Sequence, residues 1–386
     1  MNLSLNSVKR NTSFGFIFLI LLVAFSNVFV LSGFANSIHF SDRLSELSLI
    51  GMLWFACKRK PAILSRIWYG LCVVSILTMV ILSVLNYNAK AMQLCNLVTT
   101  FGIVYWVQLF SRLEWERKDL FKLGFVVSLL AMLLSYLFLP GHAWSNWNPN
   151  SSISVVPILL FGLACVWCSD FKLAHLLTIP IVLVYILIIS TLENRTSFYG
   201  ITLFCLLVLT RFAVLHKKWY RIVYISIILL NVMVPFLANV IAESNIFDEI
   251  LGMSSVGAEK AGGFNGRESL WEYAIMLNAE NPFFGLYGVR PLYPHNFSMD
   301  LLVEYGWMGW LTFYGMVIAI MEKVFRENSK YNIFAIAFVC IIFMNTFENV
   351  FSCCNVFVVF SYMLPAVVLC IHRSGCYETN GYNLLK

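Results

Sequence analysis

Residues 153–190 read ISVVPILLFGLACVWCSDFKLAHLLTIPIVLVYILIIS, which is two apolar runs joined by a short polar connection. The runs cover residues 153–168 and 174–190. Lipid offers no hydrogen-bond partner to backbone groups, so an apolar run that crosses a bilayer must be helical. Both runs are continuous, whereas the strands of a membrane barrel alternate between apolar and polar residues. The segment therefore predicts a pair of membrane-spanning helices.

The same pattern recurs along the whole chain, in which 60% of residues are hydrophobic and only 12% are charged. Soluble domains carry about 25% charged residues, and a helical span needs about 20 apolar residues. Further spans are predicted at 14–34, 67–85, 92–111, 121–139, 198–215, 223–241, 306–320, 333–347 and 351–371, with a shorter one at 47–57. The predicted fold is an all-α polytopic membrane protein with about twelve transmembrane helices, forming a single membrane domain over residues 1–386.

Basic residues predict the orientation of these spans, because loops rich in Lys and Arg stay in the cytoplasm. With a cytoplasmic N-terminus and twelve spans, only six of the 26 basic residues fall outside: Arg43, Lys90, Arg195, Lys260, Arg267 and Arg290. The bias supports the short span at 47–57, since omitting it would exchange the sides of every later loop. Both termini are then cytoplasmic, and the net charge of +6 reflects topology, because no basic stripe with interleaved aromatics predicts nucleic-acid binding.

Two other features fit more than one interpretation. Lys9 and Arg10 before the first apolar run also fit a cleaved signal peptide, although that run is longer than the roughly 7–15 residues of a signal core. Most of the eleven cysteines lie inside predicted spans, where cysteine behaves as a small apolar residue. They have no metal-ligand spacing with histidines, so no metal site is predicted.

The longest predicted outside loop, residues 242–305, holds most of the polar residues with chemical potential. Asn265 and Glu268 form a capping-box pattern that predicts a helix start, and the helix ends at Pro282. Its apolar face predicts that it lies on the membrane. Arg267 in the first turn opposes the helix dipole, which is understandable if an anion such as phosphate lies between them. The alternative is a pair with Glu268, with Glu272 or with a lipid headgroup.

A second helix is predicted after Pro294, ending at Gly306 as a C-terminal glycine. His295 would lie at its N-terminus, where the positive end of the dipole favours a neutral imidazole that can act as a general base. The alternative is a histidine that only caps the helix. Asp300 and Glu304 share one helix face, so they need a cationic partner, or orient a sugar or His295, unless the face is simply solvated.

Arg195 lies in the sequence Glu193-Asn-Arg-Thr-Ser197, which joins two spans directly. Few basic residues are predicted on the outer side, and this one has little freedom. It therefore predicts a second anion-binding group, with a snorkelling membrane anchor as the alternative.

Four segments together resemble the superfamily of O-antigen polymerases (Wzy-type) and O-antigen ligases. GRESLWEYAIMLNAENPFFGLYG at 266–288 resembles the family course of Gly-Arg, Trp, Asn-Pro and Phe-Gly-x-Gly. PHNFSMDLLVEYGWMGW at 294–310 resembles its His-Asn and Gly-x-x-Gly ending. ENRTSFYGITLF at 193–204 resembles a Ser-Arg segment that opens a span, with Asn194 in the place of Ser, and WNPNSS at 147–152 resembles an Asn-Pro-Asn step. These motifs cover 58 of the 386 residues and occur in the expected order.

The resemblance implies a GT-C-like glycosyltransferase of the bacterial inner membrane, with its active site on the periplasmic face. The donor would be an oligosaccharide on undecaprenyl pyrophosphate, and a chain-length regulator protein would be a further partner besides membrane lipids. The essential family residues fall on Arg195, Arg267 and His295. Substrate contacts are expected at Arg290, Asn296, Asp300, Glu304, Asn148 and Asn150.

The resemblance leaves two enzyme classes open. A polymerase transfers the growing glycan to a hydroxyl of another lipid-linked repeat unit, whereas a ligase transfers it to lipid A–core; the first is the prediction. A lipid-linked oligosaccharide flippase or another transporter is the remaining alternative, disfavoured because the predicted spans contain almost no charge. No Asp-x-Asp occurs, so arginines would take the place of a metal at the diphosphate, and no cofactor is expected.

Overall fold

The computed structural model describes residues 66–85, 100–111, 117–142, 149–169, 174–210, 219–243, 267–289, 291–325, 332–351 and 360–369. Within these residues all regular secondary structure is helical. The predicted spans at 14–34 and 47–57 and the predicted N-cap Asn265 lie outside them.

The helices follow the apolar runs of the sequence closely. They are α3 (Arg66–Leu85), α5 (Ile103–Phe110), α6 (Arg117–Tyr136), the 3-10 helix η1 (Pro149–Val155), α7 (Val156–Cys168), α8 (Ala174–Thr191), α9 (Arg195–Leu209), α11 (Tyr220–Glu243), α13 (Arg267–Glu280), α14 (Phe297–Val324) and α15 (Asn332–Met344). Residues 360–369 are also helical. Several helix ends differ from the prediction: α15 stops at Met344 rather than Phe347, α9 is Arg195–Leu209 rather than 198–215, and α6 is Arg117–Tyr136 rather than 121–139.

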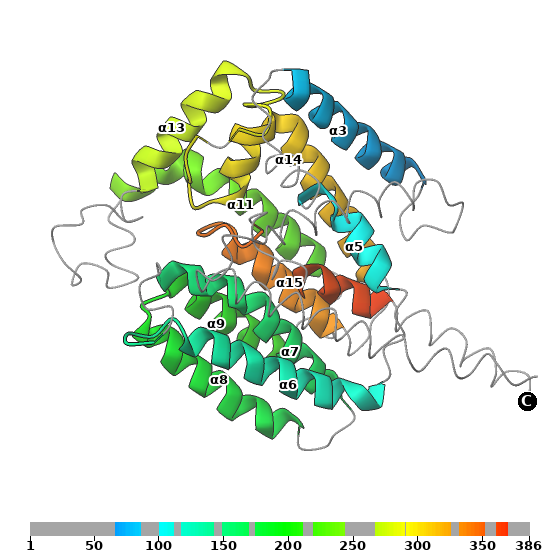
Figure 1. The fold of residues 1–386 in the computed structure, drawn as a ribbon, viewed down its shortest axis with the longest axis vertical. Coiled ribbons are helices and arrows are strands. Elements are labelled where there is room, and N and C mark those ends of the chain that lie inside the picture. Colours follow the sequence, from blue (N-terminus) through cyan, green and yellow to red (C-terminus); the bar gives the residue numbers. More distant parts are fainter. Residues whose placement is uncertain are drawn as a thin grey trace, which may run out of the picture.

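The helix α15 lies at the centre of the arrangement (Figure 1), between a group formed by α6, α7, α8 and α9 and a group that includes α11, α13 and α14. It packs against α7, α9, α11 and α14. Every residue of α15 except Ile333 and Phe343 is buried. A helix that is apolar all round must be buried in this way, so the loop that follows it is anchored to the core.

The helices α6 and α7 cross at glycines. A Cβ atom added to Gly124 would lie 2.6 Å from the Gly162 carbonyl oxygen. Small residues at such a crossing let two backbones approach closely, as helices do in membranes.

The helix α14 is two helical segments joined at Gly306, which has φ 63° and ψ −167°. The chain turns back sharply there, because the hydroxyls of Ser298 and Tyr314 lie 3.1 Å apart, whereas sixteen residues of straight helix would separate them by roughly 24 Å. The predicted end of the second loop helix at Gly306 is therefore found, and the predicted span at 306–320 begins at the same bend.

The loop after α13 replaces the hydrogen bonds that this bend removes. The carbonyl of Val303 accepts from the amide of Leu286 at 2.7 Å, and the amide of Trp307 donates to Pro282 at 2.8 Å. Gly285 has φ 60°, and a Cβ there would lie 2.5 Å from the Val303 oxygen. The two glycines therefore permit a close contact between the loop and the bend that other residues would prevent.

Several helices present apolar stripes outward. On α8 the exposed residues Leu176, Ile179, Leu183 and Leu187 follow helical spacing, as do Val74, Leu77, Ile81 and Val84 on α3. Continuous exposed apolar surface of this kind marks contact with lipid or with another protein.

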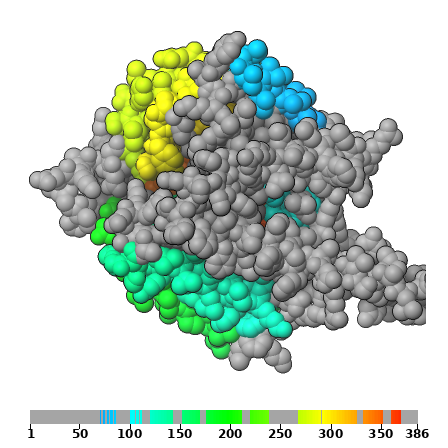
Figure 2. Space-filling view, viewed as in Figure 1, coloured from blue at the N-terminus to red at the C-terminus, as the bar shows by residue number. Residues whose placement is uncertain are grey.

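Within the described residues one helix, Tyr220–Leu237, is long and apolar enough to cross a membrane, and six apolar helices are shorter. In the space-filling view the loop helix α13 and the green helices of the α6–α9 group lie at opposite ends of the molecule (Figure 2).

Candidate active site

The turn that follows α15 is built by Asn345. Its side-chain oxygen accepts from the backbone amides of Val350 at 2.9 Å and Phe351 at 3.1 Å, and its side-chain nitrogen donates to Ile341 at 2.8 Å. These bonds give partners to two backbone amides of the turn and connect them to the last turn of α15. Asn345 is fully buried, so the turn is rigidly held and its residue Glu348 has a fixed position.

A proline in α11 helps to fix the segment that carries His295. Pro235 lies inside α11 and has no N–H, so the carbonyl of Asn231 four residues earlier has no helical donor. The side chain of Asn296 donates to that carbonyl at 2.9 Å and to the carbonyl of Thr346 at 2.8 Å. Asn296 thus connects α11, the start of α14 and the turn after α15.

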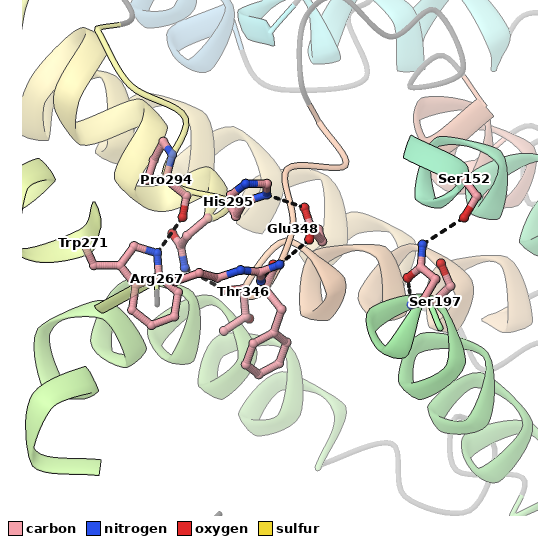
Figure 3. Close-up of polar contacts among 11 residues, drawn as sticks. Ser152, Ser197, Arg267, Trp271, Pro294, His295, Thr346 and Glu348 are labelled. Carbon is pink, nitrogen blue, oxygen red and sulfur yellow. Dashed lines mark hydrogen bonds and ion pairs between the residues drawn. The ribbon is translucent and has the colours of Figure 1, made fainter. Parts of the chain in front are cut away.

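Glu348 contacts two cationic or potentially cationic groups at once (Figure 3). One carboxylate oxygen lies 2.5 Å from Nη2 of Arg267, and the other lies 2.9 Å from Nδ1 of His295. The side chain of Glu348 is 5% exposed. A buried carboxylate needs such compensation, and these contacts bring Arg267 and His295 to a single acid.

His295 is held by its neighbours on both sides. Its φ is 52°, an uncommon conformation for a residue other than glycine. Trp271 of α13 is fully buried and donates to the carbonyl of Pro294 at 2.6 Å. The ring of Tyr293 packs edge-on against the imidazole at 4.7 Å between centroids.

The contact with Glu348 assigns the roles of the two ring nitrogens. A neutral imidazole beside a carboxylate carries its hydrogen on the nitrogen that faces the acid. In that neutral form, Nδ1 of His295 donates to Glu348 and Nε2 keeps a lone pair. The side chain is 25% exposed, so Nε2 is available to accept a proton.

Arg267 does not form the ion pairs that were predicted as alternatives to an anion site. Its partners are the Glu348 carboxylate and the backbone carbonyl of Phe347, not Glu268 or Glu272. The guanidinium has five N–H groups, and these two bonds leave others without a partner among the described residues. With 16% of the side chain exposed, they can meet a ligand from one side.

The structure gives Asn296 a structural role. It is fully buried, its side-chain oxygen caps α14 by accepting from Met299 at 2.9 Å, and both amide hydrogens are used. Neither amide hydrogen of Asn296 remains free for the predicted substrate contact.

Asp300 and Glu304 are buried, at 2% and 3% exposure. They therefore do not form the solvated face that was one interpretation of their spacing.

Arg195 is the first residue of α9, capped by Asn194, whose side chain accepts from Ser197 at 3.0 Å. The Asn194 amide also donates to Ser152 at 2.9 Å. Arg195 lines a cavity of about 400 Å³ together with Glu193, Asn194, Phe198 and Tyr199. Within the described residues its guanidinium has no polar partner.

Helix packing directs the start of α9, which carries Arg195, toward the turn after α15. A Cβ on Gly200 would touch Met344, so α9 meets α15 near the end of α15, and the start of α9 faces the turn that carries Glu348. Figure 3 shows this turn with Arg267 and His295 on one side and Ser152 and Ser197 on the other. No direct contact between Arg195 and Glu348 or His295 occurs in the described part.

Three other predicted contacts are not described by the structure. Arg290 and Asn148 lie outside the described residues, and Asn150 is described only as backbone within η1.

Residues 348–350 form one of the short outside loops that the sequence marks as candidates, but the sequence assigned no role to Glu348, and it did not point to Asn231 or Asn345 as parts of the site. Two signals were present in the chain. Glu348 is an ionisable residue between apolar segments, which marks a functional candidate in a membrane protein, and Pro235 predicts a free carbonyl at Asn231.

Searches of protein-family models, of curated proteins and of solved structures each find no match to this chain. The geometry of the site therefore carries the functional argument.

Proposed function

We propose that the chain is a membrane glycosyltransferase that polymerises a surface polysaccharide such as O-antigen. Its donor is a glycan on undecaprenyl pyrophosphate, and its acceptor is a sugar hydroxyl of another lipid-linked repeat unit. The observation that carries the proposal is the convergence of Arg267 and His295 on the buried acid Glu348. A guanidinium suits a diphosphate, and an imidazole with a free Nε2 suits the deprotonation of a hydroxyl.

The proposed reaction is a single displacement. The acceptor oxygen attacks the anomeric carbon of the donor glycan, and its proton moves to Nε2 of His295. The bond between the anomeric carbon and the pyrophosphate oxygen breaks, and its electron pair leaves with the lipid pyrophosphate. One displacement inverts the anomeric centre, by analogy with inverting glycosidases.

The arginines would stabilise the departing charge. Arg267 has N–H groups left for the pyrophosphate, and Arg195 has an uncommitted guanidinium in a cavity at the start of α9. Fixed cations of this kind act where charge develops in the transition state. The outward apolar stripes on α3 and α8 support a setting in lipid, which a lipid-linked donor requires.

The test is reconstitution in liposomes with purified undecaprenyl-pyrophosphate-linked repeat units, scored for a ladder of glycan lengths. The wild type should form the ladder, and His295→Ala should lower its rate roughly 10²–10⁴-fold, the usual value of a general base. His142→Ala is the matched control, because His142 lies in the turn after α6, its ring packs against Tyr136, and its backbone bond to Leu139 does not depend on the side chain. Full activity of His295→Ala would remove His295 from the reaction.

The same assay separates polymerase from ligase. Transfer to lipid A–core without any ladder would identify a ligase that uses the same donor. Movement of intact repeat units across the membrane without transfer would identify a flippase.

Chelation tests the arginine-based mechanism. Removal of divalent metals with EDTA should leave the ladder unchanged, since Arg267 and Arg195 supply the positive charge at the diphosphate. Loss of the ladder with EDTA, and its return with magnesium, would contradict this mechanism.

A further inference from the structure

The carboxylate of Glu348 contacts two groups, with one oxygen facing Arg267 and the other facing His295. No other partner of this carboxylate occurs among the described residues. Its side chain is 5% exposed, so bulk water does not replace either contact. A carboxylate shared between a guanidinium and an imidazole gives each of them only part of its charge. Weakening the contact with one of these two groups therefore strengthens the contact of the carboxylate with the other.

Of the three groups, the acid is the most firmly placed. The turn that carries Glu348 is fixed by Asn345 and by the Asn296–Thr346 bond. His295 is held by the Trp271–Pro294 bond and by the ring of Tyr293. Arg267, by contrast, is the first residue of its helix and has a long flexible side chain. The guanidinium is thus the group that can most easily change partner.

A diphosphate competes strongly for this guanidinium. It carries more than one negative charge and offers two oxygens to the planar fork of an arginine, whereas Glu348 offers Arg267 only one oxygen. When the guanidinium turns to a diphosphate, the full carboxylate is left to His295. An imidazole that takes a proton at Nε2 becomes a cation, and it then has an undivided counter-ion at Nδ1.

We infer that Glu348 is a shared counter-ion that couples donor binding to acceptor activation. A diphosphate draws Arg267 away from it, and Glu348 then supports the protonation of His295. Glu348 is a positioning residue here, because it acts through His295 and Arg267. This inference rests on the proposed function for the identity of the donor. It predicts that Nε2 of His295 becomes more basic when the leaving group is bound.

Nitrogen-15 NMR of the histidine rings tests the coupling without any turnover. The protein is labelled at histidine, purified in detergent micelles and studied at pH 7, and the signals of His295 are identified by their loss in His295→Gln. Inorganic pyrophosphate is the probe, with sulfate as the control anion. In the wild type, the resting ring should carry its hydrogen on Nδ1, and pyrophosphate should raise the imidazolium fraction at least about twofold, whereas sulfate should have little effect.

Two variants separate coupling from a structural role. Arg267→Ala reproduces the displaced state, so its His295 should show the raised imidazolium fraction before pyrophosphate is added. Glu348→Gln keeps the size of the side chain but not its charge, so pyrophosphate should no longer move the His295 signals, and both ring tautomers should appear. A resting Arg267→Ala spectrum identical to that of the wild type would overturn the coupling.

The outcomes also distinguish this inference from the proposed function. If the liposome assay gives a ladder but the His295 signals do not change with pyrophosphate, the coupling is rejected and the proposed polymerase function stands. A pyrophosphate response that follows the predicted variant pattern, without any transferase activity, would keep the coupling and reject the polymerase.

Discussion

At the scale of single residues, Arg267 shows why a guanidinium is needed in the site. It donates to the backbone carbonyl of Phe347 and to the carboxylate of Glu348 from different nitrogens, and still has N–H groups to spare. A lysine ammonium has three donors on one compact nitrogen. It cannot span the carbonyl, the carboxylate and a ligand from one position.

Arg267→Lys should therefore lower transferase activity roughly 10²–10³-fold, the usual cost of losing one group that stabilises developing charge, although the net charge is unchanged. The measurement is the initial rate of glycan transfer in liposomes. Arg221→Lys is a suitable control, since Arg221 pairs with Glu322 at 2.5 Å but is 60% exposed, and exposed pairs contribute little. Wild-type rates for Arg267→Lys would indicate a simple membrane anchor.

At the scale of elements, the bend in α14 positions the site. The segment before Gly306 carries the Asn296 cap, and the segment after it returns alongside, where Trp310 donates to Ser298 at 3.1 Å. The loop at 282–288 fits against the bend only because Gly285 and Gly306 lack side chains. A Cβ on Gly306 would lie 2.4 Å from the carbonyl carbon and oxygen of Phe283.

Gly306→Ala should destabilise the protein by more than about 1–2 kcal/mol, which is the cost of left-handed backbone for a residue with a Cβ, because the contact with Phe283 is added to it. Gly141→Ala is the matched control, since Gly141 has φ 82° but open space around its Cβ position. Gly141→Ala should lower the free energy of unfolding only by the cost of the positive-φ backbone. Unfolding in detergent micelles measures both, and equal losses of stability would show that the bend has room for a side chain.

The helices could be predicted from the sequence because continuous apolar runs determine them, as the agreement of α8 with residues 174–190 illustrates. The glycine at position 306 likewise predicted the end of the helical segment that begins at Phe297. The contacts between Arg267, His295 and Glu348 could not be predicted, since they join residues 81 and 53 positions apart in the sequence. The role of Asn296 was equally hidden, because the carbonyls it contacts belong to α11 and to the turn after α15.

At the scale of the whole molecule, α11 and α14 connect two polar regions. Near the start of α11, Arg221 and Tyr224 bind Glu322, which lies near the end of α14. Asn231, further along α11, contacts the segment that carries His295. The part of α14 after the bend, residues 307–324, has a helical length of about 27 Å, close to the roughly 30 Å of the hydrocarbon core. Along α11, however, Tyr224 and Asn231 are seven residues apart, which is about 10 Å of helix, so the two polar regions lie closer together than the thickness of a bilayer.

The positive-inside rule predicts that the end of α14 near Glu322 faces inward and that the segment before the Gly306 bend, which carries the site, opens outward. Alkaline phosphatase is active only after export, and green fluorescent protein exported through the general secretory route fluoresces only weakly. Phosphatase fused after Lys260, just before α13, should be active, and green fluorescent protein fused after Lys330, just before α15, should fluoresce. The positive-inside rule gives the direction, because the sequence assigns Arg221, Lys323, Arg326 and Lys330 to predicted inside loops. Activity of phosphatase at both positions would show that α14 does not cross the bilayer, and activity only after Lys330 would place His295 in the cytoplasm, away from a donor on the outer leaflet.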